Sequence, residues 1–169
     1  MKFTDIPQYT RSGNWECNFD IRGFVGQIEK WEAEDGLQLN PDFQRGHVWT
    51  EEQQISFVEF ILKGGTTARV VYLNHQGWTG DFEGEFVCVD GLQRITAVKR
   101  FIHNEIKAYG YFYKEFEGSP RMMNDLRINI NNLKTRKEVL QWYLEFNSNG
   151  TIHTKEELDK VKKLLEQES

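Results

Sequence analysis

Two short polar stretches carry the side chains whose types and spacing are best suited to chemistry. The first is Asn40-Pro41-Asp42-Phe43-Gln44-Arg45-Gly46 and the second is Asp90-Gly91-Leu92-Gln93-Arg94. Each contains a Gln-Arg pair close to a glycine, and each leads into a segment with helical patterning. Two guanidinium groups, two amides and two carboxylates beside helix N-termini suit a polyanion, such as a nucleoside triphosphate, better than a protein core.

The second stretch can be assigned roles residue by residue. An apolar strand delivers Asp90 to a sharp turn, where Gly91 can take a positive φ, and the amides of a helix follow. Those N–H groups and the helix dipole attract anions, and Arg94 adds a bidentate fork for phosphate oxygens. Asp90 would then hold Mg²⁺ or orient a water. The alternative is that Asp90 caps the helix and Arg94 pairs with a surface carboxylate.

Around the first stretch each candidate has a functional and a structural interpretation. Arg45 either contacts a phosphate or forms a bridge to Asp90 or Asp42. Trp49 either packs over the start of the next helix or stacks on a base. Glu59 borders the apolar stripe of that helix, and it is either a second carboxylate for metal or water, or a residue that pairs with an arginine or faces solvent.

A third polar segment, Asn147-Ser148-Asn149-Gly150-Thr151, separates two helical patterns. It either approaches a ligand with its backbone N–H groups or serves as an ordinary helix end and linker. No Gly-Lys-Ser/Thr follows it, which excludes a P-loop. The four histidines, His47, His75, His103 and His153, share no metal-ligand spacing, and we expect them at the surface or at helix ends.

Composition narrows the class of protein. The 169 residues suit one domain, and 21 basic against 26 acidic residues give a net charge of −5, which argues against attraction of the whole molecule to DNA. A local basic groove formed by Arg45, Arg94, Lys99 and Arg100 stays an open alternative. Cys17 and Cys88 are far apart, so zinc and redox sites are excluded, and Cys88 is expected to be buried. No leader or membrane-length apolar run is found, which favours a cytoplasmic protein.

Periodicity predicts helices and short strands that interleave without a regular β-α-β rhythm. The first 20 residues are expected to form an irregular arm. Helices are predicted over 24–31, between Thr50 and Gly64, over 92–103, from 119 to 126, from Thr135 to 146 and from Thr154 onward, and strands over 37–39, 69–73, 86–89 and 106–113. The expected fold class is α+β, with a small mixed sheet flanked by helices.

At these motifs the chain resembles domain-of-unknown-function family 262, which includes the GmrS half of GmrSD-type, modification-dependent restriction enzymes. The resemblance rests on the stretch 41–49, on the helix 58–64 that ends in glycine, on Asp90-Gly91-Leu92-Gln93-Arg94, and on 147–158. The usual second motif is Asp-Gly-Gln-Gln-Arg, so Leu92 is a departure that removes one polar contact. Asn149 in place of Gly and Ile152 in place of Pro are further departures. The chain is most similar to short versions of the family found in phages and prophages.

The resemblance implies a ParB/sulfiredoxin-like fold with C-terminal helices. Residues 1–36 would form an N-terminal arm and first helix, 37–118 the ParB-like core with both Gln-Arg motifs, and 119–169 a C-terminal helical part packed on the same domain. It also implies nucleotide binding, with hydrolysis that licenses DNA restriction in larger members. The nucleotide or phosphate site would comprise Gln44, Arg45, Gly91, Arg94, Asn147 and Asn149, with Asp90 and Gln93 catalytic and Asp90 also the Mg²⁺ ligand.

Two hypotheses of different class follow. The first is a nucleotide-binding, ParB-like domain whose partner is a nucleoside triphosphate, with Mg²⁺-dependent hydrolysis as an open question, in phage or host DNA restriction or anti-restriction. The second is a non-catalytic phage protein that binds a host protein, DNA or a DNA-processing partner. No membrane partner is expected, and the sequence leaves the oligomeric state open. Because the chain lacks a His-Asn-His-type nuclease segment, we expect no DNA cleavage by this chain alone.

Overall fold

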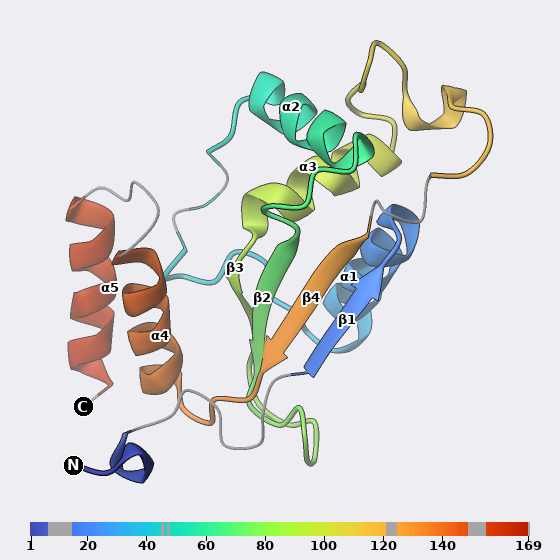
Figure 1. Cartoon of the computed structure of the whole chain (residues 1–169). Helices are drawn as coiled ribbons and strands as arrows, with labels where there is room; N and C mark the ends of the chain where they lie inside the picture. Colours follow the sequence, from blue (N-terminus) through green and yellow to red (C-terminus); the bar gives the residue numbers. More distant parts are fainter. Residues whose placement is uncertain (7–14, 45, 47, 121–124, 149–154, 169) are drawn as a thin grey trace.

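A four-stranded mixed sheet with helices on both faces forms the body of the computed structural model (Figure 1). The structure describes residues 1–6, 15–44, 46, 48–120, 125–148 and 155–168. The elements are β1 (Trp15–Phe19), α1 (Ile21–Glu34), α2 (Glu51–Leu62), β2 (Val70–His75), β3 (Phe86–Asp90), α3 (Leu92–Ile102), β4 (Leu126–Asn131), α4 (Arg136–Ser148) and α5 (Lys155–Gln167), with 3₁₀ turns at Phe3–Asp5 and Tyr113–Glu115. The predicted α+β class, a small mixed sheet flanked by helices, is confirmed.

The strands lie in the order β1-β4-β2-β3. β4 runs parallel to β2, while β1 pairs with β4 and β3 pairs with β2 in antiparallel fashion. Side chains alternate between the two faces of a strand. In β3, Phe86 and Cys88 belong to one buried apolar cluster, while Val87 and Val89 belong to another. The sheet therefore separates two cores.

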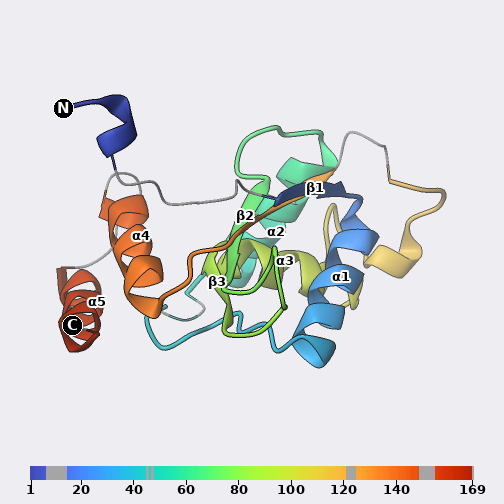
Figure 2. The same ribbon diagram turned by 90° about the horizontal axis from the view of Figure 1, so that it is seen from below.

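The two cores have different sizes and different helices. The larger core packs α1, α2 and α3 against one face of the sheet, and the smaller packs α4 and α5 against the other face near β3. Figure 2 shows α4 and α5 on the opposite side of β2 and β3 from α1. All three predicted segments contribute strands to this one sheet. β1 lies in the predicted arm (1–36), β2 and β3 lie in the predicted core (37–118), and β4 lies in the predicted C-terminal part (119–169).

Predictions that rest on local signals are confirmed. The Thr50 hydroxyl accepts from the Gln53 amide, and the Gln53 side chain accepts from the Thr50 amide, so the capping box begins α2 as expected. Thr135 and Glu138 bond in the same reciprocal way before α4. Cys88 is fully buried, and burial raises the pKa of its thiol far above the ordinary value. Its thiol is therefore inert at neutral pH.

Three predictions of local structure are wrong. Residues 15–19 form β1 rather than part of an irregular arm, and Leu126, predicted as the end of a helix from 119, is the first residue of β4; residues 121–124 of that helix lie outside the described residues. Residues 106–113 are not a strand: Ala108 and Tyr111 exchange backbone hydrogen bonds around a tight turn in which Tyr109 and Gly110 both have positive φ. Two consecutive positive φ angles are the geometry of a type I′ turn.

A buried asparagine fixes the connection from β4 to α4. Asn74 is fully buried; its Nδ2 donates to the carbonyl of Leu133 at 3.1 Å, and its Oδ1 accepts from the Leu133 amide at 2.8 Å. Both backbone groups of Leu133 are thereby satisfied although the residue lies outside the sheet. This pairing positions the first turn of α4 next to the end of β4. None of the described helices combines the length and apolar character needed to cross a bilayer.

His75 differs from the prediction that the histidines lie at the surface. Only 3% of the residue is exposed, its ring packs against Phe86 with centroids 4.9 Å apart, and its Nδ1 accepts from the Gly77 amide. Burial lowers the pKa of His75 below its ordinary value of 6.5, and the charge of Asp35 opposes this only in part. The folded protein therefore holds this imidazole neutral at a pH where the unfolded chain protonates it.

We predict that the free energy of unfolding decreases as the pH falls below about 6.5, because between the two pKa values the unfolded state binds one more proton at His75. Denaturant unfolding at about pH 7.5 and about pH 5.5 measures the change. A His75→Gln variant should show a smaller loss over the same interval. An identical loss in the variant would remove His75 from the pH dependence.

Candidate functional site

The turn after β3 requires a glycine. Gly91 has a φ of +126°, and a Cβ built there would lie 2.6 Å from Cγ1 of Val71 on the neighbouring strand. Both the dihedral angle and the close approach exclude other residues without strain. The Asp90-Gly91 pair thus forms the sharp connection that the sequence predicts, and it places the first turn of α3 at the end of β3.

The N-terminus of α3 differs from those of the neighbouring helices. Asp20 caps α1 through the amides of Arg22 and Gly23, and Thr50 caps α2. At α3 the cap position is Gly91, and within the described residues no side chain caps the helix. The alternative that Asp90 caps α3 is therefore wrong. An uncapped helix N-terminus presents free amide donors and the positive end of the dipole to whatever lies in front of it.

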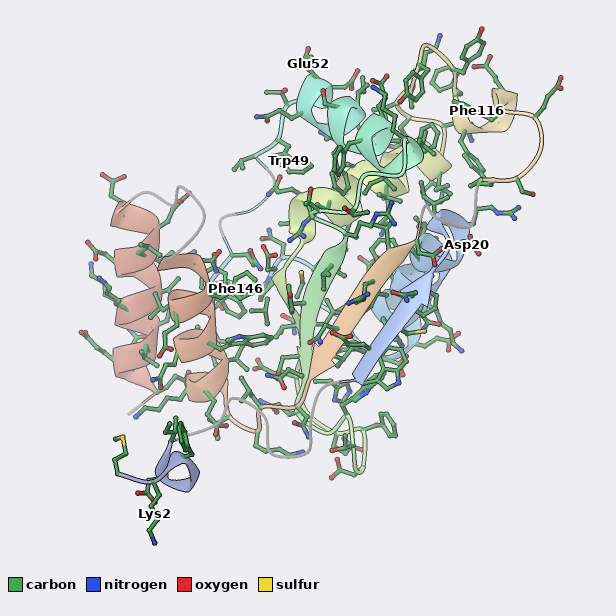
Figure 3. All side chains as sticks on the ribbon, in the orientation of Figure 1. Lys2, Asp20, Trp49, Glu52, Phe116 and Phe146 are labelled. Carbon is green, nitrogen blue, oxygen red and sulfur yellow. The ribbon has the colours of Figure 1, made fainter. Side chains whose placement is uncertain are left out.

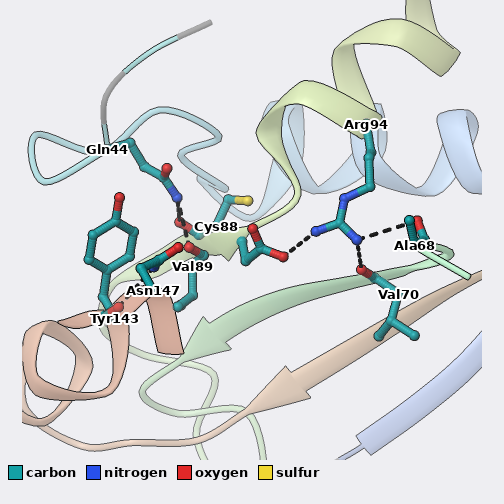
Figure 4. Close-up of polar contacts among 9 residues, drawn as sticks. Gln44, Ala68, Val70, Cys88, Val89, Arg94, Tyr143 and Asn147 are labelled. Atoms are coloured by element: carbon teal, nitrogen blue, oxygen red, sulfur yellow. Dashed lines mark hydrogen bonds and ion pairs between the residues drawn. The ribbon is translucent and has the colours of Figure 1, made fainter. Parts of the chain in front are cut away.

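Asp90 is paired with Arg94 instead (Figure 4). The Nη2 of Arg94 bonds to Oδ2 of Asp90, and its Nη1 donates to the carbonyls of Val70 at 2.5 Å and Ala68 at 3.3 Å. Only 15% of the Arg94 side chain is exposed. The guanidinium therefore ties the start of β2 to the turn after β3. It enters the site as one half of an ion pair with Asp90 that is held in a fixed position.

Both motif glutamines hold the loop between Phe43 and Thr50. Gln44 donates from Nε2 to the carbonyls of Cys88 and Val89, each at 2.9 Å, which fastens the loop to the edge of β3. Gln93 accepts at Oε1 from the amides of Val48 and Trp49 and donates from Nε2 to the Gly46 carbonyl at 2.7 Å. The loop thus lies against the N-terminus of α3 through side-chain amides in place of secondary structure.

A cavity of about 320 Å³ opens where these parts meet. Of the residues predicted for the site, it is lined by Gln44, Asp90, Gly91, Gln93, Arg94 and Asn147. Three segments far apart in the sequence therefore converge as predicted, although the individual roles in binding and catalysis stay predictions. Arg45 and Asn149 lie outside the described residues.

Aromatic residues that the motifs did not identify also line the cavity. Tyr143 on α4 faces it one turn before Asn147, whose Nδ2 donates to the Tyr143 carbonyl at 2.8 Å. Trp49 stands at the end of the loop, just before α2 (Figure 3), and its ring packs edge-on against Phe57. Trp49 thus packs over the helix start and lines the cavity as well. The i, i+4 spacing of Tyr143 and Asn147 is the signal that could have placed both on one face of α4.

The motif residues before Gln44 anchor the C-terminal helices. Asp42 pairs with Arg136 at the start of α4, and its carbonyl accepts from Nζ of Lys160 on α5 at 2.6 Å. The hydrogen bond that Arg136 donates to Asp42 is the main reason that the pKa of Arg136 is raised. Phe43 is buried and meets Tyr143 edge to face, with ring centroids 5.1 Å apart. These contacts position α4, and with it the wall of the cavity.

Among its described lining residues the cavity offers one carboxylate, already paired with Arg94, for the expected magnesium ion, so the metal site stays a prediction. Asp90 is the one carboxylate among the described residues that line the cavity, and no group of three or more His, Cys, Asp or Glu is found in the described part of the chain. Mg²⁺ is commonly held by one or two carboxylates together with substrate phosphates. Glu59 does not line this cavity; it accepts from the Tyr109 amide at 2.7 Å.

We predict that Gln93→Ala lowers the free energy of unfolding by about 2 kcal/mol, because the amides of Val48 and Trp49 lose their acceptor. Gln93→Glu keeps an acceptor oxygen and loses only the donor to Gly46. Denaturant unfolding should therefore rank Gln93→Glu between the original chain and Gln93→Ala. Equal stability of all three proteins would show that the loop does not depend on Gln93.

Comparison with known proteins agrees with this arrangement of motifs. A search of curated proteins and a search of solved structures found no match, so the likeness to the ParB/sulfiredoxin fold stays a prediction. A family model described as "GmrSD restriction endonuclease, N-terminal domain" matches residues 28–168, which is most of the chain and includes every residue predicted for the site. The chain therefore belongs to the family of GmrSD restriction endonuclease N-terminal domains.

Proposed function

We propose that this chain binds a nucleoside triphosphate in the cavity at the N-terminus of α3, as a nucleotide-dependent component of DNA restriction or anti-restriction in the cytoplasm. The observation that carries the proposal is an uncapped helix N-terminus, with a fixed guanidinium one turn along it, that opens into a cavity of about 320 Å³. Backbone amides, the helix dipole and a held cation together favour phosphate oxygens. The family's link to restriction supports the cellular role.

The polar and aromatic residues of the cavity lie in two groups, and this suits a ligand that has both phosphates and a base. Gly91 at the start of α3 and the Arg94 guanidinium form a donor-rich end for phosphates, whereas Trp49 and Tyr143 supply aromatic surface for a base. Asp90 keeps Oδ1 available beside the phosphate end, because its described contact with Arg94 uses Oδ2. In a hydrolytic reaction that oxygen would orient a water or share Mg²⁺ with the phosphates. Gln93 would act as a positioning residue through the loop that it holds.

A non-catalytic interaction protein is the second candidate function. Leu92 stands where the family usually has a glutamine, and the side chains of Gln44, Gln93 and Arg94 already bond to the protein itself. Because these polar groups already bond to the protein, the site could keep its shape without binding or hydrolysing a substrate. Binding and hydrolysis therefore have to be measured separately.

Calorimetric titration with each nucleoside triphosphate and Mg²⁺ tests the first candidate. We expect binding that Arg94→Gln weakens by at least about tenfold, because the variant removes the positive charge at the phosphate end. Arg100→Gln is the matched control: it removes the same charge from the same helix, but Arg100 pairs with Glu51 and Glu105 outside the cavity. Circular dichroism should show both variants folded. Absence of heat with every nucleotide would favour the interaction protein.

We predict that Asp90→Asn binds nucleotide with unchanged or higher affinity but releases no phosphate. The amide oxygen can still accept from Arg94, whereas the negative charge that would hold Mg²⁺ or activate a water is lost. A phosphate-release assay under saturating nucleotide measures the second part. Release by the variant at the rate of the original protein would exclude Asp90 from the mechanism.

A further inference from the structure

A second polar cavity, of about 310 Å³, lies at the N-terminal ends of β2 and β4. It is lined by Asn18, Thr66, Arg69, Val70, Asp125 and Arg127, none of which lines the cavity at α3. The two cavities are neighbours, because Ala68 lines the first and the next two residues line the second. Neither Gln-Arg motif contributes to it.

Arg69 brings an unsatisfied donor to this cavity. Its Nε donates to the carbonyl of Gly65, which fixes the guanidinium against the start of the α2–β2 loop. Its Nη2 is buried, and among the described residues no atom accepts a hydrogen bond from it. Buried polar groups are nearly always paired, and a charged one without a partner is costly. The arrangement is that of a donor whose acceptor is supplied from outside the chain.

Arg127 is the second arginine that lines this cavity. Its amide donates to the Arg69 carbonyl at 2.9 Å, so the two arginines come from adjacent chain segments. Its Nε donates to Oδ1 of Asn18 at 3.2 Å, and its Nη1 lies 3.7 Å from the carboxylate of Glu16. That ion pair is about half exposed on both sides and is therefore weak. Arg127 is held in direction but not neutralised.

The charged and polar groups around the cavity suit a singly charged oxyanion. Arg69 and Arg127 contribute two positive charges and Asp125 one negative charge, while the hydroxyl of Thr66 and the amide of Asn18 add neutral polar groups. A phosphodiester carries one negative charge and two oxygens in the geometry that an arginine fork recognises. Asp125 and, in part, Glu16 beside Arg127 offset the two arginine charges, so a dianionic terminal phosphate would bring more negative charge than the site can balance. We propose that this cavity binds a phosphodiester group of a nucleotide chain.

Such a group occurs in a linear nucleic acid and in a cyclic dinucleotide. Only the local charge matters for the contact, so the net charge of −5 limits the affinity without excluding the site. The site does not depend on the proposed triphosphate cavity, since it shares no lining residue with it. A phosphodiester seated here would lie beside the wall formed by residues 68–70, which Arg94 holds from the other side.

Nuclear magnetic resonance of the full chain labelled with nitrogen-15 tests the proposal. The probe is thymidylyl-thymidine, which has one phosphodiester and no terminal phosphate, and free thymidine is the control ligand without that group. We expect thymidylyl-thymidine to shift the Nε–H signals of Arg69 and Arg127 and the amide signal of Thr66, and thymidine to leave them in place. Equal shifts with both ligands, no shift at all, or shifts confined to residues 90–94 would overturn the proposal.

Two variants of equal charge change sharpen the test. Arg127→Gln removes a half-exposed side chain and should weaken binding by at least about tenfold while the spectrum keeps the dispersion of a folded protein. Lys137→Gln removes an exposed charge from the first turn of α4, beyond the other end of β4, and should bind as the original chain does. Equal loss in both variants would show a non-specific charge effect and overturn the site. Tighter binding of a linear oligonucleotide or of a cyclic dinucleotide then identifies the source of the phosphodiester.

Discussion

The hydrogen bonds of Arg94 hold together the parts of the chain that form the main cavity. One side chain contacts the carboxylate that ends β3 and two carbonyls at the start of β2, from a position on the first turn of α3. The two carbonyls of Ala68 and Val70 lie at the N-terminal end of β2, an inner strand of the sheet, and Arg94 links them to α3. Gly91 lies at the centre of this turn and tolerates no Cβ. The direction of α3 relative to β3 is therefore fixed both by the Arg94 hydrogen bonds and by the close packing at Gly91. The cavity therefore has a rigid floor.

The motif residues build the site as much as they line it. Asp42 positions α4 and α5, Gln44 fastens the loop to β3, and Gln93 fastens the same loop to α3. The two glutamine side chains bond to backbone carbonyl groups, and the Asp42 carboxylate pairs with the charge of Arg136. Such side-chain contacts are needed here because the described residues between Pro41 and Thr50 form no strand that could pair with the sheet. A ligand bound there would meet charges and dipoles that are already oriented, which lowers the cost of reorganisation on binding.

The cavity lies at the boundary of the two cores, and this explains its mixed lining. The larger core holds α3 and the sheet, whereas the smaller core holds α4 against Val87 and Val89. Asn147 and Tyr143 reach the cavity only because the small core brings α4 to the edge of β3. The position of α4 depends on Asn74, which hydrogen-bonds to both backbone groups of Leu133, and on the Asp42–Arg136 pair. Changes in these distant contacts would therefore alter the wall of the site without touching a ligand.

The sequence by itself determined the features that depend on neighbours along the chain. The capping boxes at Thr50 and Thr135, the apolar strands β2 and β3, and the glycine turn after Asp90 were all predictable, because their interactions span a few residues. Tertiary structure alone decided which strands pair: β1 and β4 were missed, since pairing Trp15 with Ile130 joins residues far apart in sequence. It also decided that His75 is buried and that Arg69 and Arg127 share a cavity. Those outcomes depend on long-range packing, which no local pattern of residues encodes.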